Sequence, residues 1–439
     1  MRRFTRRGVL KAGSGLAVAG LAGPALLESA RAWAATEMPF QPEQGAQLRL
    51  LRWNRFVQSE EEAFMALLDA FTQSTGVSVQ VDSEGFEDLR PKAAVAANIG
   101  SGPDIVWGIH ADAHLYPDAM LDVSDVAEHL GGKYGGWYEA SEFYGKRDGR
   151  WITLPFVFSG NLLNFRRSHV QAAGFEGVPD NTDDFLTLCQ KLKENNTPAG
   201  MALGNASGDG NAWCYWLLWA FGGKVVDEDN QVVLNSPETI AALEYARELV
   251  PTFVSGAASW LDPSNNKAFL AGDVSLTNNG ISIYAAAERE GMADLAEDTD
   301  HAFYPIGPVG HPTEFHVLFP VMLYNHTPYP NAAKALMTWL MEKEQYDRLL
   351  QGSVGYLSHP LRAYKDHPVW TEDPKRTVFR DVAERTLPFS YAGDLGYAAS
   401  SVFADFVVVN MIGEAATGAK TPQQAAEDAQ RRAERYYNV

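Results

Sequence analysis

The feature that most constrains the fold is an apolar run from Trp151 to Phe165, rich in β-branched and aromatic residues and interrupted by Pro155 and Gly160. A strand inside a sheet disfavours proline, because proline has no amide hydrogen to donate to the neighbouring strand. The run therefore predicts a crossover that leaves one sheet, passes a break and enters a second sheet. A single long edge strand with a bulge fits the same residues.

The first 34 residues predict an export signal. Arg6 and Arg7 form a twin arginine in a basic start, and the mildly apolar run from Gly13 to Leu27 is too short to span a membrane stably. Residues 32–34, Ala-Trp-Ala, give the small-x-small pattern of a cleavage site. This combination is typical of the bacterial twin-arginine route. We expect a mature protein in the periplasm, whereas a transmembrane anchor fits less well.

The mature chain is strongly acidic. The signal carries 6 of the 36 Lys and Arg residues and 1 of the 55 Asp and Glu residues, which leaves 30 basic and 54 acidic groups and a net charge of −24. Such a charge argues against nucleic acid and anionic membranes as partners. Cys189 and Cys214 are the only cysteines, and we expect two buried free thiols.

The mature chain opens with a strand–helix–strand pattern, which predicts a parallel, right-handed crossover and a doubly wound α/β lobe. The helix is expected to begin at a capping box, residues 59–62, and to end at Gly76. The expected elements are strands at 48–53, 77–81 and 105–107, with helices after residue 59 and from 88 to about 97.

Short motifs in a fixed order continue to the carboxyl end. They are Gly102-Pro103-Asp104, Gly149-Arg150-Trp151 with Leu154-Pro155, Phe269 to Asp273 leading to Thr277–Gly280, Tyr304-Pro305, and a helix over 331–350 followed by Gly355-Tyr356. In this order and spacing the chain resembles the extracellular solute-binding proteins of bacterial ABC importers. Within them it is similar to the carbohydrate-type family that includes maltose-binding protein.

The resemblance implies an α/β, two-lobe periplasmic-binding-protein fold, with doubly wound sheets joined by a multi-strand hinge. It places residues 45–157 and 306–345 in the first lobe and residues 158–305 and 346–439 in the second. It also implies a monomer whose partners are a small-molecule solute and the transmembrane subunits of an ABC permease.

Candidate site residues are aromatic and polar side chains on loops at strand ends, where α/β proteins usually bind ligands. Aromatic faces suit the C–H surfaces of sugars, while amides and carboxylates bind their hydroxyl groups. The candidates are Trp53, Asn54, Arg55, Glu84, Phe86, Trp107, His110, Ser159, Asn161, Asn205, Asp209, Trp213, Asn278, Asn279, Tyr284, His316 and Tyr356.

Several candidates have a second interpretation. Trp53 and Trp107 end apolar strands and fit the core equally well, and Trp213 belongs to a tryptophan stripe of which at least one member should be core. Arg55 has glutamates at 60–62 with which it can pair. The family often has a tryptophan where this chain has Ile281-Ser282, and a glycine-rich turn where it has residues 315–319. The solute can therefore not be named from the resemblance.

The predicted function is capture of a small neutral solute, a mono- or oligosaccharide or a polyol, and its delivery to the permease, without enzyme activity, cofactor or metal. The chain has no Walker loop, HExxH or G-x-S-x-G motif. His110 and His114 lack further zinc ligands in sequence, and a calcium-like acidic loop has Val232 where glycine is needed. The alternatives are a secreted carbohydrate-active enzyme, or a binder of a phosphorylated solute or metal on the same fold.

Overall fold

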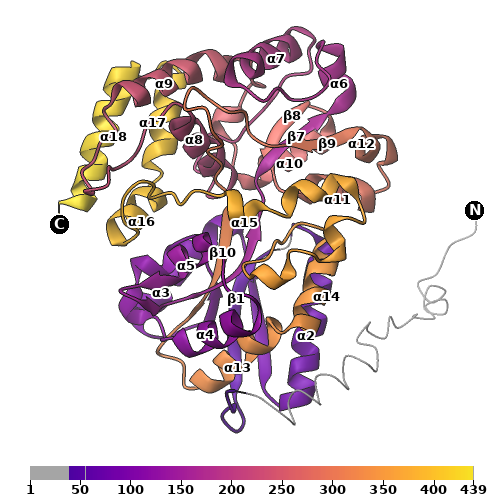
Figure 1. Ribbon diagram of the computed structural model, residues 1–439, viewed down its shortest axis with the longest axis vertical. Helices are drawn as coiled ribbons and strands as arrows, with labels where there is room; N and C mark the ends of the chain where they lie inside the picture. Colours follow the sequence, from indigo (N-terminus) through magenta and orange to yellow (C-terminus); the bar gives the residue numbers. More distant parts are fainter. Residues whose placement is uncertain (1–38, 55, 439) are drawn as a thin grey trace, which may run out of the picture.

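The computed structural model describes residues 39–54 and 56–438. The predicted export signal, residues 1–34, and the candidate Arg55 lie outside the described residues. Figure 1 shows two bodies along the long axis, a lower one built on β1 and β10 and an upper one built on β7, β8 and β9. The predicted α/β, two-lobe fold is confirmed.

The lower body contains a five-stranded sheet in the order β2-β1-β3-β10-β6. β1 pairs in parallel with β2 and β3, and β10 is antiparallel to both β3 and β6. The strands are β1 (Gln47–Trp53), β2 (Ser78–Glu84), β3 (Ile105–Trp107), β6 (Leu154–Ser159) and β10 (Val317–Leu323). The parallel β1–β2 pair, joined by α2 (Gln58–Thr75), matches the predicted strand–helix–strand unit.

The predicted capping box at the start of α2 is wrong. The N-cap is Val57, whose side chain makes no capping hydrogen bond. Glu60 is instead fully buried and forms an ion pair with Arg52 at 2.7 Å, because a buried guanidinium on β1 needs a counterion. The predicted end of α2 at Gly76 is confirmed. Gly76 has a φ of 76°, a left-handed conformation that glycine adopts without a Cβ clash.

The predicted crossover is confirmed. The chain leaves β6, passes Gly160 and Asn161, and enters β7 (Leu162–Arg166), the central strand of a three-stranded antiparallel sheet with β8 (Leu276–Asn279) and β9 (Thr299–Ala302). Pro155, however, lies within β6 and not at the break. It is tolerated there because β6 is an edge strand, and the register of β10 shifts beside it.

Helices surround both sheets (Figure 1). Those beside the first sheet are α3 (Leu89–Ile99), α4 (Ser124–Lys133), α5 (Glu139–Gly145), α13 (Pro330–Leu340) and α14 (Lys343–Ser353), with a small hairpin of β4 (Lys146–Arg147) and β5 (Arg150–Trp151). The others are α6 (Arg167–Ala172), α7 (Thr182–Glu194), α8 (Asp209–Ala220), α9 (Pro237–Leu249), α10 (Asp262–Ala271), α11 (Ser282–Arg289), α12 (Ala293–Asp298), α15 (Val382–Arg385), α16 (Tyr397–Ala404), α17 (Val407–Ala416) and α18 (Pro422–Tyr437).

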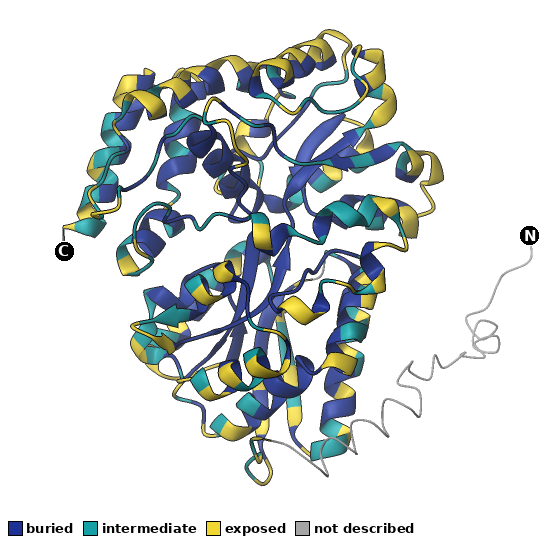
Figure 2. Cartoon of the chain, viewed as in Figure 1, coloured by how far each residue is buried: buried dark blue, intermediate teal, exposed yellow. Residues whose placement is uncertain are grey.

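Each body has its own hydrophobic core. Most strands of the sheets and all of α8 are buried, whereas the edge strand β2 is exposed or half-buried (Figure 2). Every residue of α8 is buried, which suits a helix that is apolar on all sides. Cys189 and Cys214 are both buried and free, as expected. The segment Tyr397–Ala416 is long and apolar enough to cross a membrane, but 61% of it is buried inside the protein, as in a core helix.

The limits predicted for the two lobes stay predictions. The carboxyl-terminal part of the chain, after residue 346, suggests one change to them. α14 packs against α2, and its residues Tyr346 and Leu349 belong to the first core. The tail first contributes to the second core at Val382. We propose that the second lobe resumes near Val382 instead of at residue 346.

Candidate functional site

A cavity lies where the chain crosses between the two sheets. Its volume is about 40 Å³, which is room for a few water molecules. Small-molecule sites typically measure roughly 300–1,000 Å³, so a sugar enters only if the walls separate. The lining residues are Phe56, Phe86, Ser159, Gly160, Asn161, Gly208, Asp209, Asp262, Asn266, Asn279, Gly280, Ser282, Val317, Phe319 and Tyr356.

One side of the cavity, here called the aromatic wall, consists of Phe56, Phe86, Val317, Phe319 and Tyr356. Phe86 contacts both Phe56 and Phe319, with ring centroids 5.8 and 6.1 Å apart. Phe56 lies 6.3 Å from Tyr356. The first four residues belong to the five-stranded sheet or to loops that follow its strands, so the lower body supplies most of this wall.

The opposite side, here called the polar wall, comes from the second body. Asp209 begins α8, Asp262 and Asn266 lie on α10, Asn279 ends β8 and Ser282 begins α11. Asn279 donates a hydrogen bond to Asn266, and Ser282 donates one to Asn279 at 3.1 Å. Asn266 also donates to Ser282 at 2.9 Å, so these three side chains form one hydrogen-bonded cluster.

Asp209 is the centre of the polar wall. Its two carboxyl oxygens accept hydrogen bonds from Asn161 at 2.6 Å and from Asn265 at 2.8 Å. Burial and the nearby Asp262 carboxylate raise the pKa of Asp209 well above its ordinary value, against the lowering effect of the two amides. The Asp209 carboxyl is therefore harder to ionise than that of a free aspartate.

Asp262 holds the start of α8 in place. Its carboxylate accepts hydrogen bonds from the backbone N–H of Asp209 at 2.6 Å and of Gly208 at 3.1 Å. These donors are orphan groups at a helix N-terminus, where a negative charge is favourable. Burial nevertheless raises the pKa of Asp262 to about 6, because it outweighs the backbone hydrogen bonds.

Asn161, the residue at the crossover, is fixed from two sides. Its side-chain oxygen accepts hydrogen bonds from the Tyr304 hydroxyl at 2.6 Å and from Asn278 at 3.0 Å. Its backbone N–H donates to Nδ1 of His316 at 3.1 Å, and Nε2 of His316 lies 3.0 Å from Glu314. His316 is therefore a support behind Asn161, not part of the cavity lining.

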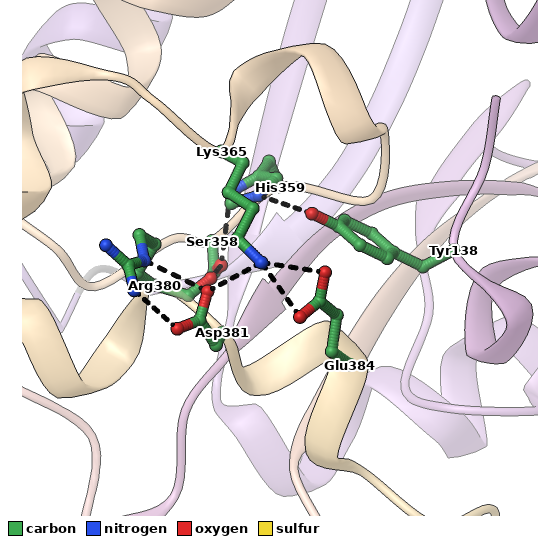
Figure 3. A network of polar contacts seen from close by, with 7 residues as sticks. All are labelled: Tyr138, Ser358, His359, Lys365, Arg380, Asp381 and Glu384. Carbon is green, nitrogen blue, oxygen red and sulfur yellow. Dashed lines mark hydrogen bonds and ion pairs between the residues drawn. The ribbon is translucent and has the colours of Figure 1, made fainter. Parts of the chain in front are cut away.

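The segment that carries Tyr356 is attached to the edge strand β6. Ser358 and Phe158 exchange two backbone hydrogen bonds, of 2.9 and 2.7 Å. Figure 3 shows the surrounding network, in which His359 lies 3.1 Å from the Tyr138 hydroxyl and Lys365 binds Glu384 at 2.9 Å. Burial lowers the pKa of His359 to about 3, so this ring is neutral at physiological pH. The network holds Ser358 and His359, which follow Tyr356 by two and three residues in the chain.

The structure brings six of the predicted residues to the cavity and places the others elsewhere. Those at the cavity are Phe86, Ser159, Asn161, Asp209, Asn279 and Tyr356. Buried behind it or elsewhere in the core are Trp53, Trp107, His110, Trp213, Asn278 and His316. Asn54 and Asn205 are exposed, Glu84 pairs with Lys92, and Tyr284 binds Glu288 and Asp373.

Packing explains why the tryptophans and His110 lie away from the cavity. Trp53 contacts Phe319 and Trp107, with ring centroids 4.1 and 5.1 Å apart, so it lies behind the aromatic wall. Trp213 donates from its indole to the Ala202 carbonyl at 2.6 Å inside the second core. His110 stacks on Phe315 at 4.6 Å. Each of these rings packs in a hydrophobic core and so does not line the cavity.

The sequence reasoning missed several lining residues, above all Phe56, Asp262, Asn266 and Phe319. Asp262 precedes Pro263 at the start of α10, a pattern that marks a helix start but not a site. Phe319 lies inside a fully buried strand and carries no local signal. Among the described residues, no group of three or more His, Cys, Asp or Glu side chains is placed to hold a metal ion.

A family model described as bacterial extracellular solute-binding protein matches residues 66–378. The chain belongs to this family. A probable ABC transporter-binding protein of Deinococcus radiodurans is 24% identical over 371 residues, which cover 80% of this chain and 86% of that protein.

Solved structures share the fold. Maltose-bound MalE3 of T. maritima has a TM-score of 0.76 at 18% identity and covers 89% of this chain and 99% of its own. A sugar transporter of Arthrobacter chlorophenolicus with bound laminaribiose has a TM-score of 0.77 at 18% identity, with the same coverage. A solute-binding protein of Agrobacterium radiobacter with ribitol has a TM-score of 0.74 at 19% identity, covering 90% and 99%.

Proposed function

We propose that this protein is the periplasmic substrate-binding component of an ABC importer, which binds a sugar or polyol between its lobes and delivers it to the membrane permease. The observation that carries the proposal is the two-sided cavity at the crossover, with an aromatic wall facing a polar wall. Aromatic side chains suit the C–H faces of sugars, and amides and carboxyls suit their hydroxyl groups.

Opening and closing of the lobes is part of this proposal. The cavity of about 40 Å³ is too small for a sugar, so binding requires the two walls to separate and then to close around the solute. Hinge closure is a known way in which two domains enclose a ligand, and the ligand shifts the population toward the closed form. The Gly160–Asn161 crossover is one of the connections that would bend.

The proposal has three further parts: export to the periplasm by the twin-arginine route, a monomeric state, and docking to permease subunits. The export route rests on the amino-terminal sequence. The permease partner is supported by the family and by the Deinococcus relative, whose name refers to an ABC transporter.

We propose binding without turnover. A glycosidase needs two carboxyl groups on opposite sides of the scissile bond. Asp262 accepts a hydrogen bond from the backbone of Asp209, so both acids lie on the same wall. The cavity lining contains no lysine, arginine or histidine among the described residues, which does not favour a phosphorylated solute.

The test is thermal unfolding of the mature protein, residues 35–439, against sugars, polyols, sugar phosphates and metal ions. A ligand at roughly 100 times its dissociation constant adds about 2.7 kcal/mol to the free energy of unfolding. We expect a rise in Tm with a sugar or polyol and no hydrolysis of chromogenic glycosides. A response only to metals or phosphates, or steady glycoside turnover, would contradict the proposal.

A further inference from the structure

The cavity has more acidic character than a neutral solute requires. Asp209 and Asp262 both line it, and no basic side chain lines it among the described residues. Glu87 lies close enough to raise the pKa of both acids through its charge. An uncompensated buried carboxylate is costly unless a cation or hydrogen bonds stabilise it.

The two acids differ in what the protein already provides. Asp262 is bound to backbone N–H groups at the start of α8 and has a structural role. Within the described part of the chain, the Asp209 carboxyl accepts hydrogen bonds from two neutral amides, those of Asn161 and Asn265. Among the described residues, no positive charge forms an ion pair with it at 4.0 Å or less. Asp209 is therefore the acid whose charge is left for a ligand to neutralise.

The opposite wall supports the same conclusion. Phe56, Phe86, Phe319 and Tyr356 place several aromatic rings on a cavity of about 40 Å³. Cations are attracted to aromatic faces, and more strongly when water is excluded. An acid facing an aromatic cluster is a common arrangement for recognising ammonium groups.

We infer that the solute carries a protonated amine in addition to its hydroxyl groups, and that the amine binds between the Asp209 carboxylate and the aromatic wall. This inference rests on the proposed function. It changes one part of the prediction from sequence, because the solute is then an amino sugar or amino polyol instead of a neutral sugar or polyol. The amides of Asn161, Asn266 and Asn279 remain available for hydroxyl groups.

Binding of the amine should release a proton. Burial and the charges of Asp262 and Glu87, which face it, raise the pKa of Asp209, so in the free protein it holds its proton to higher pH than a free aspartate does. An ammonium group favours the ionised carboxylate, so the carboxyl proton leaves to solvent when the amine binds. The affinity for amines should then rise with pH by up to about tenfold per pH unit, while Asp209 is protonated in the free protein.

The experiment compares matched ligands by isothermal titration calorimetry: glucosamine with glucose and N-acetylglucosamine, galactosamine with galactose, and 1-amino-1-deoxysorbitol with sorbitol. Repeating each titration in two buffers of different ionisation enthalpy counts the protons released. We expect one amine to bind at least about tenfold more tightly than its hydroxyl and acetylated partners, with net release of protons that the hydroxyl and acetylated partners do not show.

Variants locate the effect. D209N should bring the ratio of the affinity for the amine to the affinity for its hydroxyl partner down to about one, whether or not it weakens binding overall. The proton count on the unaltered protein tests the inference even if D209N folds poorly. D298N is the matched control, because Asp298 pairs with Arg166 at 2.6 Å and does not line the cavity. This variant should keep the preference for the amine.

The outcomes separate the two proposals. Tighter binding of a hydroxyl partner without proton release would overturn the inference and leave the proposed function intact. A preference for amines that survives in D209N would also overturn it, because the amine would then bind away from Asp209. No binding of any sugar or polyol, neutral or cationic, would overturn both.

Discussion

The two walls of the cavity differ in how the protein builds them. The aromatic wall is the surface of a packed core, in which Phe319 is backed by Trp53 and Phe86 contacts both Phe56 and Phe319. The polar wall is a network of amides and carboxyls placed by the starts of α8, α10 and α11 and by the end of β8. The first wall depends on shape and packing, and the second depends on individual hydrogen bonds.

This difference has a consequence for substitutions. A change behind the aromatic wall should mainly alter the free energy of unfolding, because it leaves a void in the core. A change in the polar wall should mainly alter affinity or its dependence on pH, because it alters donors, acceptors and charge. The predictions below test this division, from the largest expected effect to the smallest.

Trp53→Ala should lower the free energy of unfolding by about 3–5 kcal/mol, because it removes a fully buried ring from the core behind Phe319. The matched variant is Phe56→Ala at the half-buried edge of the cavity, where we expect a loss under about 2 kcal/mol. Denaturant unfolding of both proteins measures the difference. Equal losses would show that the wall and the core behind it are not distinct.

Asp262 should make the free energy of unfolding of the ligand-free protein fall as pH rises. Its folded pKa of about 6 lies above the ordinary value of 3.8, so its contribution is fully present below about pH 4 and is lost as pH rises through about 6. The expected loss is up to about 3 kcal/mol, from a shift of roughly two pKa units. Unfolding of the unaltered protein and of Asp262→Asn between pH 4 and 8 measures it.

The control for this pH effect is Asp298→Asn. Burial alone would raise the pKa of Asp298, but hydrogen bonds from Ser168 and the charge of Arg166 outweigh it and lower the pKa. The contribution of Asp298 is therefore present at neutral pH and lost as pH falls. If both variants gave the same sign of pH dependence, the electrostatic account of the polar wall would be incorrect.

Gly208→Leu should lower the affinity for the solute at least about 100-fold, or roughly 2.7 kcal/mol. An added Cβ would lie 3.0 Å from Asp262 Oδ1 and 3.7 Å from Phe86, so a larger side chain would fill the space between the walls. Gly177→Leu is the control, because a Cβ there meets no atom within 4 Å. Unchanged affinity in G208L by calorimetry would place the solute elsewhere.

Tyr304→Phe should have the smallest effect, about 1 kcal/mol of binding free energy or a few-fold in Kd. The Tyr304 hydroxyl donates to Asn161 at 2.6 Å and orients its amide, but Tyr304 does not line the cavity. Calorimetry measures the affinity, and circular dichroism checks that the fold is kept. A loss above about 100-fold would mean that Tyr304 contacts the solute directly.

The sequence predicted the architecture well where local patterns carry the information. The run from Trp151 to Phe165 predicted the crossover, because strand residues on both sides of Gly160 belong to different sheets. The start of α2 was predicted wrongly, because Glu60 is recruited by Arg52 on a neighbouring strand. That pairing is tertiary and leaves no local signal.

The candidate site was predicted less completely. Asn161, Asp209 and Tyr356 follow glycine or precede a helix, and such turn positions are visible in sequence. The predicted residues Trp53 and Trp107 end strands and Trp213 lies in α8, and all three fill the cores instead of lining the cavity. Phe319 and Asp262 reach the cavity only because β10 and α10 return to it from distant parts of the chain.

The most direct test of the central claim is calorimetric titration of the best-binding solute into Phe56→Ala and Asn279→Ala. Each variant removes one side chain from one wall. If the solute is held between the walls, both variants should bind it about tenfold more weakly, a loss of roughly 1.4 kcal/mol each. If either variant keeps the affinity of the unaltered protein, its wall takes no part in binding and the two-walled site is wrong.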